Sequence, residues 1–190
     1  GSATNDAGTG MLQALGFQFL DKAGNTLGQG GKILGNVVHI CTQKVHPLLK
    51  NAHFIVACDV NNPFHGPEGA AHTYARRKGA DDTMIAALDE GMRSFAQVIH
   101  QETGKDIATL PGSGAAGGMG GGMMAFLHAE LKPGADLLLD LSRFEERIAD
   151  ADLIITGEGR IDRQSLMGKI PGKILQKGKE RNIPVIALVG

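Results

Sequence analysis

Residues 111–122 read Pro-Gly-Ser-Gly-Ala-Ala-Gly-Gly-Met-Gly-Gly-Gly and lead directly into the helix-like run 123–131. Glycine has no Cβ atom, so several backbone N–H groups of such a loop can converge on one anion, and a following helix N-terminus adds unsatisfied donors. The segment predicts either a phosphate-binding loop or a plain connection where a helix packs closely against its neighbours. Two further glycine-containing loops, residues 1–10 and 156–162, favour the first interpretation.

The surrounding apolar runs predict an α/β fold, in which helices flank a buried, mainly parallel or mixed sheet. Residues 54–58, 153–155 and 184–189 have the length and branching of buried strands, and residues 17–20 read as a short strand. Because ligands of open α/β sheets gather where strands end, Asp59, which follows the run 54–58, is a candidate binding residue.

Helices are predicted from residue periodicity and capping signals. The clearest spans residues 81–102, where apolar residues recur three and four positions apart. Its expected buried face consists of Met84, Ile85, Leu88, Met92, Phe95, Val98 and Ile99. Shorter helices are expected over residues 10–15, in the segment that ends at Arg77, and over 171–181. Thr4 or Asn5 is the expected N-cap of the first of these. The glycine-rich loop 28–35 is expected to border the site.

Composition narrows the class of protein. The chain has 190 residues, 42% of them hydrophobic, which suffices for one substantial core. Nineteen basic and twenty acidic residues give a formal charge of −1, so nucleic acid is not the expected partner. No apolar run approaches a membrane span, and Cys41 and Cys58 read as free thiols. We expect a cytoplasmic enzyme that uses no membrane.

Two common nucleotide-binding motifs, the P-loop and the dinucleotide fingerprint, bear on the function of the glycine-rich segments. A P-loop is excluded, because no Gly-x-x-x-x-Gly-Lys-Ser/Thr motif occurs; the Gly-Lys pairs at 31–32, 168–169 and 172–173, for example, are each followed by isoleucine. The spacing Gly112-x-Gly114-x-x-Gly117 satisfies a dinucleotide fingerprint, although no convincing strand leads into it. An oxidoreductase is therefore kept as an alternative.

Charged residues in the loops supply the groups that phosphoryl transfer requires. That reaction needs a carboxylate to hold Mg²⁺ or orient the nucleophile, a fixed cation, and backbone donors for phosphate oxygens. Asp6 lies in the first glycine loop, and Glu158, Arg160 and Asp162 follow the strand at 153–155. Two carboxylates and an arginine between glycines are unusual for a surface turn.

At these residues the chain resembles the bacterial glycerate kinases of the type I family. The resemblance covers nearly the whole chain, and its most specific stretches are Gly-Ala-Ala-Gly-Gly-Met-Gly at 114–120 and Gly-Glu-Gly-Arg-Ile-Asp at 157–162. The other matching stretches are 1–6, 10–16, 57–60, 62–63, 66–70, 78–80, 111–113, 155–156, Ser165, 168–169 and 184–188. Residues 74–77 read Tyr-Ala-Arg-Arg, where relatives usually show Gly-Pro-Gln before Lys-Gly.

The resemblance implies a fold of two α/β domains and phosphorylation of D-glycerate by ATP with Mg²⁺, giving 2- or 3-phosphoglycerate. It also implies that residues 1–190 are one central domain with both ends truncated, because no counterpart of the family's N-terminal Asp-Gly-Gly-Glu-Gly-Thr-like motif is present. A non-catalytic domain that binds substrate or nucleotide is therefore the alternative. Assembly into a homo-oligomer is left open.

From chemistry we assign catalytic roles to Asp6 and Arg160, and Mg²⁺ binding to Glu158 and Asp162. Phosphate or substrate binding is assigned to Ser2, Thr4, Asn5, Asp59, Gly112, Gly114, Gly117 and Gly118.

Overall fold

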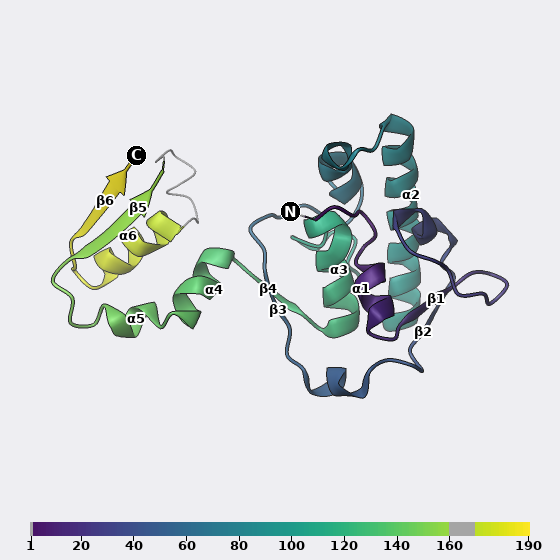
Figure 1. Cartoon of the computed structure of the whole chain (residues 1–190), viewed down its shortest axis with the longest axis horizontal. Coiled ribbons are helices and arrows are strands. Elements are labelled where there is room, and N and C mark those ends of the chain that lie inside the picture. Colours follow the sequence, from purple (N-terminus) through teal and green to yellow (C-terminus); the bar gives the residue numbers. More distant parts are fainter. Residues whose placement is uncertain (1, 160–169) are drawn as a thin grey trace. The chain divides into compact units, whose positions relative to one another are not determined.

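The computed structural model describes residues 2–159 and 170–190, and the chain divides into two compact units, Gly1–Leu131 and Lys132–Gly190 (Figure 1). Both units combine helices with small sheets, which confirms the predicted α/β class. The assignment of residues 1–190 to a single central domain stays a prediction. Among the described residues, no helix has the length and apolar character needed to cross a membrane.

The first unit is built from helices and two small sheets. Strands β1 (Gln18–Leu20) and β2 (His39–Cys41) pair antiparallel, with Phe19 opposite Ile40. Strands β3 (Ile55–Ala57) and β4 (Glu130–Lys132) form the second sheet. The remaining elements are α1 (Thr9–Ala14), η1 (Gly31–Asn36), η2 (Pro47–Asn51), η3 (Ala71–Ala75), η4 (Arg76–Lys78), α2 (Asp82–Thr103) and α3 (Ala115–Leu127).

Helix α2 organises this unit, and the predicted helix over 81–102 is confirmed. The Asp81 side chain accepts a hydrogen bond of 2.8 Å from the Met84 N–H at its start, and Gly104, with φ of 73°, ends it. Most of the predicted apolar face is buried, and Phe95 packs edge-to-face on Phe19 at the centre of the core. Met84 is an exception, because its side chain is 54% exposed.

The glycine-rich segment differs from the predicted loop, because helix α3 already begins at Ala115. Residues 116–118 interrupt it with positive φ angles, and the residues from Met119 onward are helical. A Cβ at Gly122 would lie 2.1 Å from the Ala7 carbonyl oxygen, and one at Gly121 2.6 Å from the Phe64 ring. Glycines 120–122 thus serve close helix packing, which explains why they are helical despite their low propensity.

The second unit places a helix on a parallel strand pair. Strands β5 (Ile154–Glu158) and β6 (Val185–Val189) pair in parallel, with Ile154 opposite Val185, as expected for these runs. Helix α6 (Ile170–Glu180) covers one face, where Ile154 and Ile174 are buried, and α4 (Gly134–Leu141) and α5 (Phe144–Arg147) complete the unit.

The expectation of fully buried strands is wrong for three of the runs. Ile155 is 63% exposed and Ile186 48% exposed, because α6 covers a single face of the β5–β6 pair. In the first unit, Ile55 of β3 is 39% exposed, since β3 pairs with β4 in a sheet of two strands.

Candidate functional site

The two glycine-containing loops of the first unit lie directly against each other. The Ala7 N–H donates a hydrogen bond of 3.0 Å to the Gly117 carbonyl oxygen. A Cβ at Gly117 would stand 2.2 Å from the Thr4 oxygen, and one at Gly118 3.1 Å from the Ala7 Cα. The fold therefore brings the segment 4–7 against Gly117 and Gly118, whereas Gly112 and Gly114 lie against residues 58, 60 and 62–63.

Asp6 is held rigidly at this junction. Its side chain is buried, Oδ1 accepts from the Gly8 N–H at 3.1 Å, and Oδ2 accepts from the Gly10 N–H at 3.3 Å. The Thr9 hydroxyl donates to the Asp6 carbonyl oxygen at 2.9 Å. The predicted capping of this helix by Thr4 or Asn5 is wrong, because the N-cap is Gly8 and the Asp6 carboxylate binds the N–H groups at the helix start. A carboxylate fixed in this way can orient a hydroxyl without reorganising.

Lys78, which the sequence reasoning did not select, supplies a cation to the same loop. Its ammonium donates a hydrogen bond of 2.8 Å to the Ser2 hydroxyl and another to the Thr4 carbonyl oxygen. Burial lowers the pKa of Lys78, and the negative charge of Asp6 opposes part of that shift. Lys78 belongs to the stretch Lys-Gly-Ala at 78–80, which matches the family and is the sequence feature that could have indicated it.

Asn5 adds a buried amide to the loop. Its Nδ2 donates to the Met92 sulfur at 3.2 Å, whereas Oδ1 is buried and has no hydrogen-bond partner among the described residues. A buried acceptor without a donor costs stability, so such groups are frequent where a ligand supplies the missing bond.

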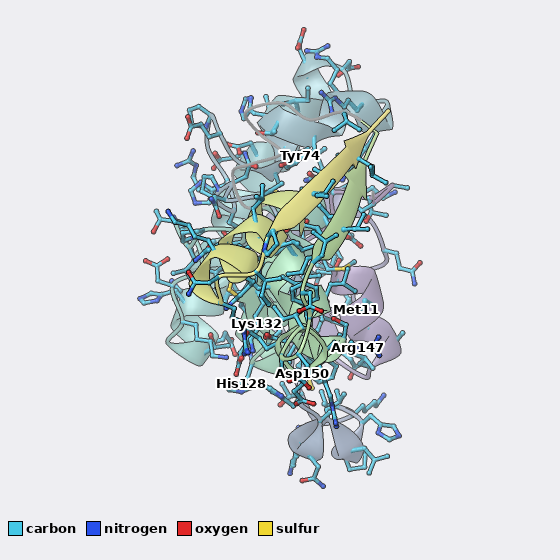
Figure 2. All side chains as sticks on the ribbon, turned by 90° about the vertical axis from the view of Figure 1, so that its left-hand side faces the viewer. Met11, Tyr74, His128, Lys132, Arg147 and Asp150 are labelled. Carbon is cyan, nitrogen blue, oxygen red and sulfur yellow. The ribbon has the colours of Figure 1, made fainter. Side chains whose placement is uncertain are left out.

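Neighbouring loops support the glycine segment from its other side. The Gly114 N–H donates to the Asn62 carbonyl oxygen at 3.0 Å. The hydroxyl of Tyr74, the residue labelled in Figure 2, donates to the Asn62 side-chain oxygen at 2.6 Å. Tyr74, which lies where the sequence departs from its family pattern, therefore buttresses the loop that holds Gly114. Asp59 is exposed beyond β3, and its neighbour Cys58 has its sulfur 3.1 Å from the position of a Cβ at Gly112.

The remaining predicted residues belong to the second unit or are not described. Glu158 is the exposed last residue of β5, and Arg160 and Asp162 lie outside the described residues. Across residues 2–159 and 170–190, no group of three His, Cys, Asp or Glu side chains is arranged to hold a metal ion. The roles of Glu158 and Asp162 as Mg²⁺ ligands stay predictions.

The dinucleotide alternative loses its structural context. A fingerprint of that kind sits between a strand and the helix that the strand leads into. Residues 104–111, which connect α2 to the glycine segment, contain no strand. The Gly112–Gly117 spacing therefore lacks the strand-to-helix context of a dinucleotide fingerprint.

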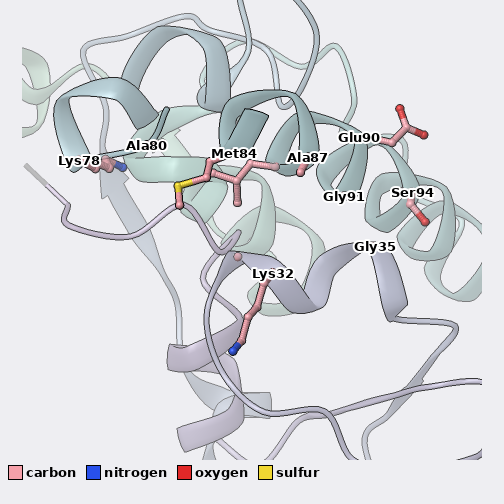
Figure 3. A pocket seen from close by; sticks show the side chains of 12 residues that line it. Lys32, Gly35, Lys78, Ala80, Met84, Ala87, Glu90, Gly91 and Ser94 are labelled. Carbon is pink, nitrogen blue, oxygen red and sulfur yellow. The ribbon is translucent and has the colours of Figure 1, made fainter. Parts of the chain in front are cut away.

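A cavity of about 710 Å³ lies beside the loop, between η1 and α2 (Figure 3). Lys78 stands at one end, Glu90 and Ser94 stand at the other, and Met84 points across the space. Its wall also includes Gly31, Lys32, Gly35, Gly79, Ala80, Ala87, Leu88 and Gly91. Part of the predicted glycine-rich loop 28–35 thus borders this cavity.

Comparison with known proteins gives a consistent result. Residues 1–190 match the model of the glycerate kinase family. Glycerate kinases from Halalkalibacterium halodurans and Haemophilus influenzae are each 47% identical to the chain, covering 100% of it and 50% of the relative. The glycerate 2-kinase of Escherichia coli is 45% identical over the same shares. The chain spans about half the length of these curated relatives.

A solved structure agrees with the sequence comparison. The crystal structure of a Salmonella typhimurium protein assigned as glycerate kinase 2 superposes with a TM-score of 0.93 at 44% identity. The match covers 100% of this chain and 51% of that one.

Proposed function

The chain belongs to the glycerate kinase family, and from this premise we propose that it provides the phosphate- and glycerate-binding loops of an ATP-dependent glycerate kinase. The observation that carries the proposal is the convergence of Asp6, Lys78 and the loop 114–118 in one place. A fixed carboxylate and a fixed cation are two of the groups that phosphoryl transfer to an alcohol uses.

The chemistry assigns each group a role. A glycerate hydroxyl oxygen forms a bond to the γ-phosphorus of ATP, the bond from that phosphorus to the bridging oxygen breaks, and ADP departs. Asp6 orients the hydroxyl and accepts its proton, since its carboxylate is already fixed by the Gly8 and Gly10 N–H groups. Lys78 offsets negative charge on the phosphate oxygens.

Further roles are proposed for individual residues on the basis of their chemistry alone. Arg160 is proposed to bind the transferring phosphoryl group or the glycerate carboxylate, where a planar guanidinium makes paired hydrogen bonds. Mg²⁺ would supply charge neutralisation at the ATP phosphates, with Glu158 and Asp162 as its proposed ligands. The amide oxygen of Asn5, which is buried and has no donor within residues 2–159 and 170–190, is proposed to accept a bond from a substrate hydroxyl.

The alternative is a domain that binds substrate without turning it over, and the observation that favours it is the coverage of half of each relative. The two are separated by measuring ADP release with ATP, Mg²⁺ and D-glycerate, with Arg160→Ala as the control. Turnover that requires D-glycerate and disappears in the variant supports the kinase. Binding of both substrates without turnover supports the alternative, and a folded chain that binds neither contradicts both.

A further inference from the structure

The cavity between η1 and α2 shares a residue, Lys78, with the proposed phosphate site. Lys78 lines the cavity and also donates its hydrogen bonds to Ser2 and Thr4. On the opposite wall, a Cβ at Gly31 would stand 2.2 Å from the Asn5 carbonyl oxygen, so η1 rests directly on the same loop. A ligand whose anionic end binds at Lys78 would therefore place its other end between η1 and α2.

The walls of the cavity suit a flat, largely apolar group. Gly31, Gly35 and Gly91 present backbone in place of side chains, and Gly35 approaches Gly91 closely enough that a Cβ on Gly35 would lie 3.6 Å from the Gly91 Cα. Met84 and Leu88 supply apolar surface from α2. The exposure of Met84, on a helix whose apolar residues are otherwise mostly buried, is explained if a ring system packs against its side chain.

Polar groups stand at the two ends of the cavity, and each end favours a different part of a ligand. Lys78 is cationic, whereas Ser94, which is half-buried, and Glu90, whose carboxylate is directed away from η1, stand at the far end (Figure 3). The Glu90 carboxylate lies 3.4 Å from the Arg93 guanidinium. Phosphates are therefore favoured at the Lys78 end, and hydrogen-bonding edges of a ring or sugar are favoured at the Ser94 end.

We propose that this cavity binds the purine nucleoside part of a nucleoside triphosphate, with the phosphates directed to Lys78 and the loop 2–6. The inference rests on the proposed kinase function, because it assigns the donor nucleotide to one side of that site. A volume of about 710 Å³ lies within the range of about 300–1,000 Å³ typical of ligand pockets. Glycerate is a small and wholly polar acid, and it would leave these apolar walls without a partner.

The test uses two neighbouring alanines of α2. Ala87 lines the cavity, whereas Ala86 does not, and both are exposed. Tryptophan at 87 fills the space, and tryptophan at 86 is the matched control. Calorimetric titration with ATP, adenosine, inorganic tripolyphosphate and D-glycerate measures each part of the ligand separately. Because the natural chain has no tryptophan, each variant also carries one fluorescent reporter.

We expect Ala87→Trp to weaken ATP and adenosine binding by about tenfold or more while tripolyphosphate binding is unchanged. Ala86→Trp should match the parent protein for all ligands. Met84→Ala, which removes an exposed wall residue with little risk to folding, should weaken ATP binding by a smaller factor.

Three outcomes separate the proposals. ATP binding that Ala87→Trp leaves unchanged, or a loss confined to D-glycerate, overturns the nucleoside assignment and leaves the kinase function standing. Tripolyphosphate binding that survives Lys78→Ala, together with ATP binding lost in Ala87→Trp, supports the cavity and contradicts the phosphate site. If Ala87→Trp loses its helical circular dichroism, it is not folded, and Met84→Ala becomes the test. Unchanged ATP binding by Met84→Ala then overturns the inference.

Discussion

The Lys78 ammonium donates a hydrogen bond of 2.8 Å to the Ser2 hydroxyl, across 76 residues of sequence. This contact fixes a cation over a loop whose other members are a buried carboxylate, Asp6, and a buried amide, Asn5. A half-buried ammonium keeps less hydration than an exposed one, so an arriving anion displaces less water and gains a stronger charge interaction.

As pH rises, the affinity of the protein for tripolyphosphate should begin to fall at a lower pH than it would if Lys78 had the pKa of an exposed lysine. Burial lowers the pKa of Lys78, so its positive charge is lost as pH rises through a folded-state value below the unfolded one. Titrations between roughly pH 7 and pH 10 would show the decline.

The matched variants for this test are Lys78→Arg and Lys22→Arg. A guanidinium stays protonated throughout that range, so Lys78→Arg should flatten the pH profile even where its affinity is lower. Lys22 is exposed in the turn that follows β1, and its variant should keep the parent profile. A parent profile that matches Lys78→Arg would exclude Lys78 from anion binding.

Gly117→Ala should destabilise the first unit far more than Gly24→Ala. Both glycines have positive φ, 75° and 81°, so each alanine bears a similar backbone strain of about 1 kcal/mol. The Gly24 site has no atom within 4 Å of a new Cβ, whereas at Gly117 the Thr4 oxygen would be 2.2 Å away. We expect the free energy of unfolding in urea to fall by about 2 kcal/mol more for Gly117→Ala. Equal losses would show that the loop 2–6 moves aside freely.

The sequence anticipated the elements that depend on local pattern. Helix α2 follows from periodicity and its Asp81 cap, and the parallel β5–β6 pair follows from two apolar runs separated by a helix. The prediction of a loop over 120–122 is wrong, because these glycines are helical. Their helical state depends on contacts with Ala7 and Phe64, which are distant in sequence.

The sequence predicted some members of the candidate site, whose roles stay predictions, and missed others. Residue types selected Asp6 and the glycine loops, which the fold brings together. Lys78 and the cavity depend on how η1 packs against α2 and the loop 2–6, and no local spacing encodes that packing. Met84 is predicted to lie on the buried face of the helix, but it is exposed and lines the cavity. Its position at one end of the apolar face is the sequence feature that could have indicated this.

Two adjacent isoleucines of β5 should respond differently to truncation. Ile154 is 7% exposed and packs in the cluster with Ile174, whereas Ile155 is 63% exposed on the uncovered face. Ile154→Ala should lower the free energy of unfolding by about 2–4 kcal/mol, and Ile155→Ala by less than about 1 kcal/mol. Chemical unfolding followed by circular dichroism measures both. A large loss in Ile155→Ala would mean that another surface covers this face in solution.

Asp6→Asn should separate the structural role of this carboxylate from its proposed catalytic one. Both carboxylate oxygens accept backbone N–H groups, so the amide places a donor against either Gly8 or Gly10 and should cost about 1–3 kcal/mol of stability. Loss of the charge should lower kcat by about 10²–10⁴-fold, because the glycerate hydroxyl loses its proton acceptor. ATP affinity should change little. Asp106→Asn, an exposed carboxylate that accepts the Ala108 N–H, is the control and should retain full kcat. If folded Asp6→Asn turned over D-glycerate at the parent rate, Asp6 would be a structural residue that holds the start of α1, and the proton acceptor would have to be sought elsewhere.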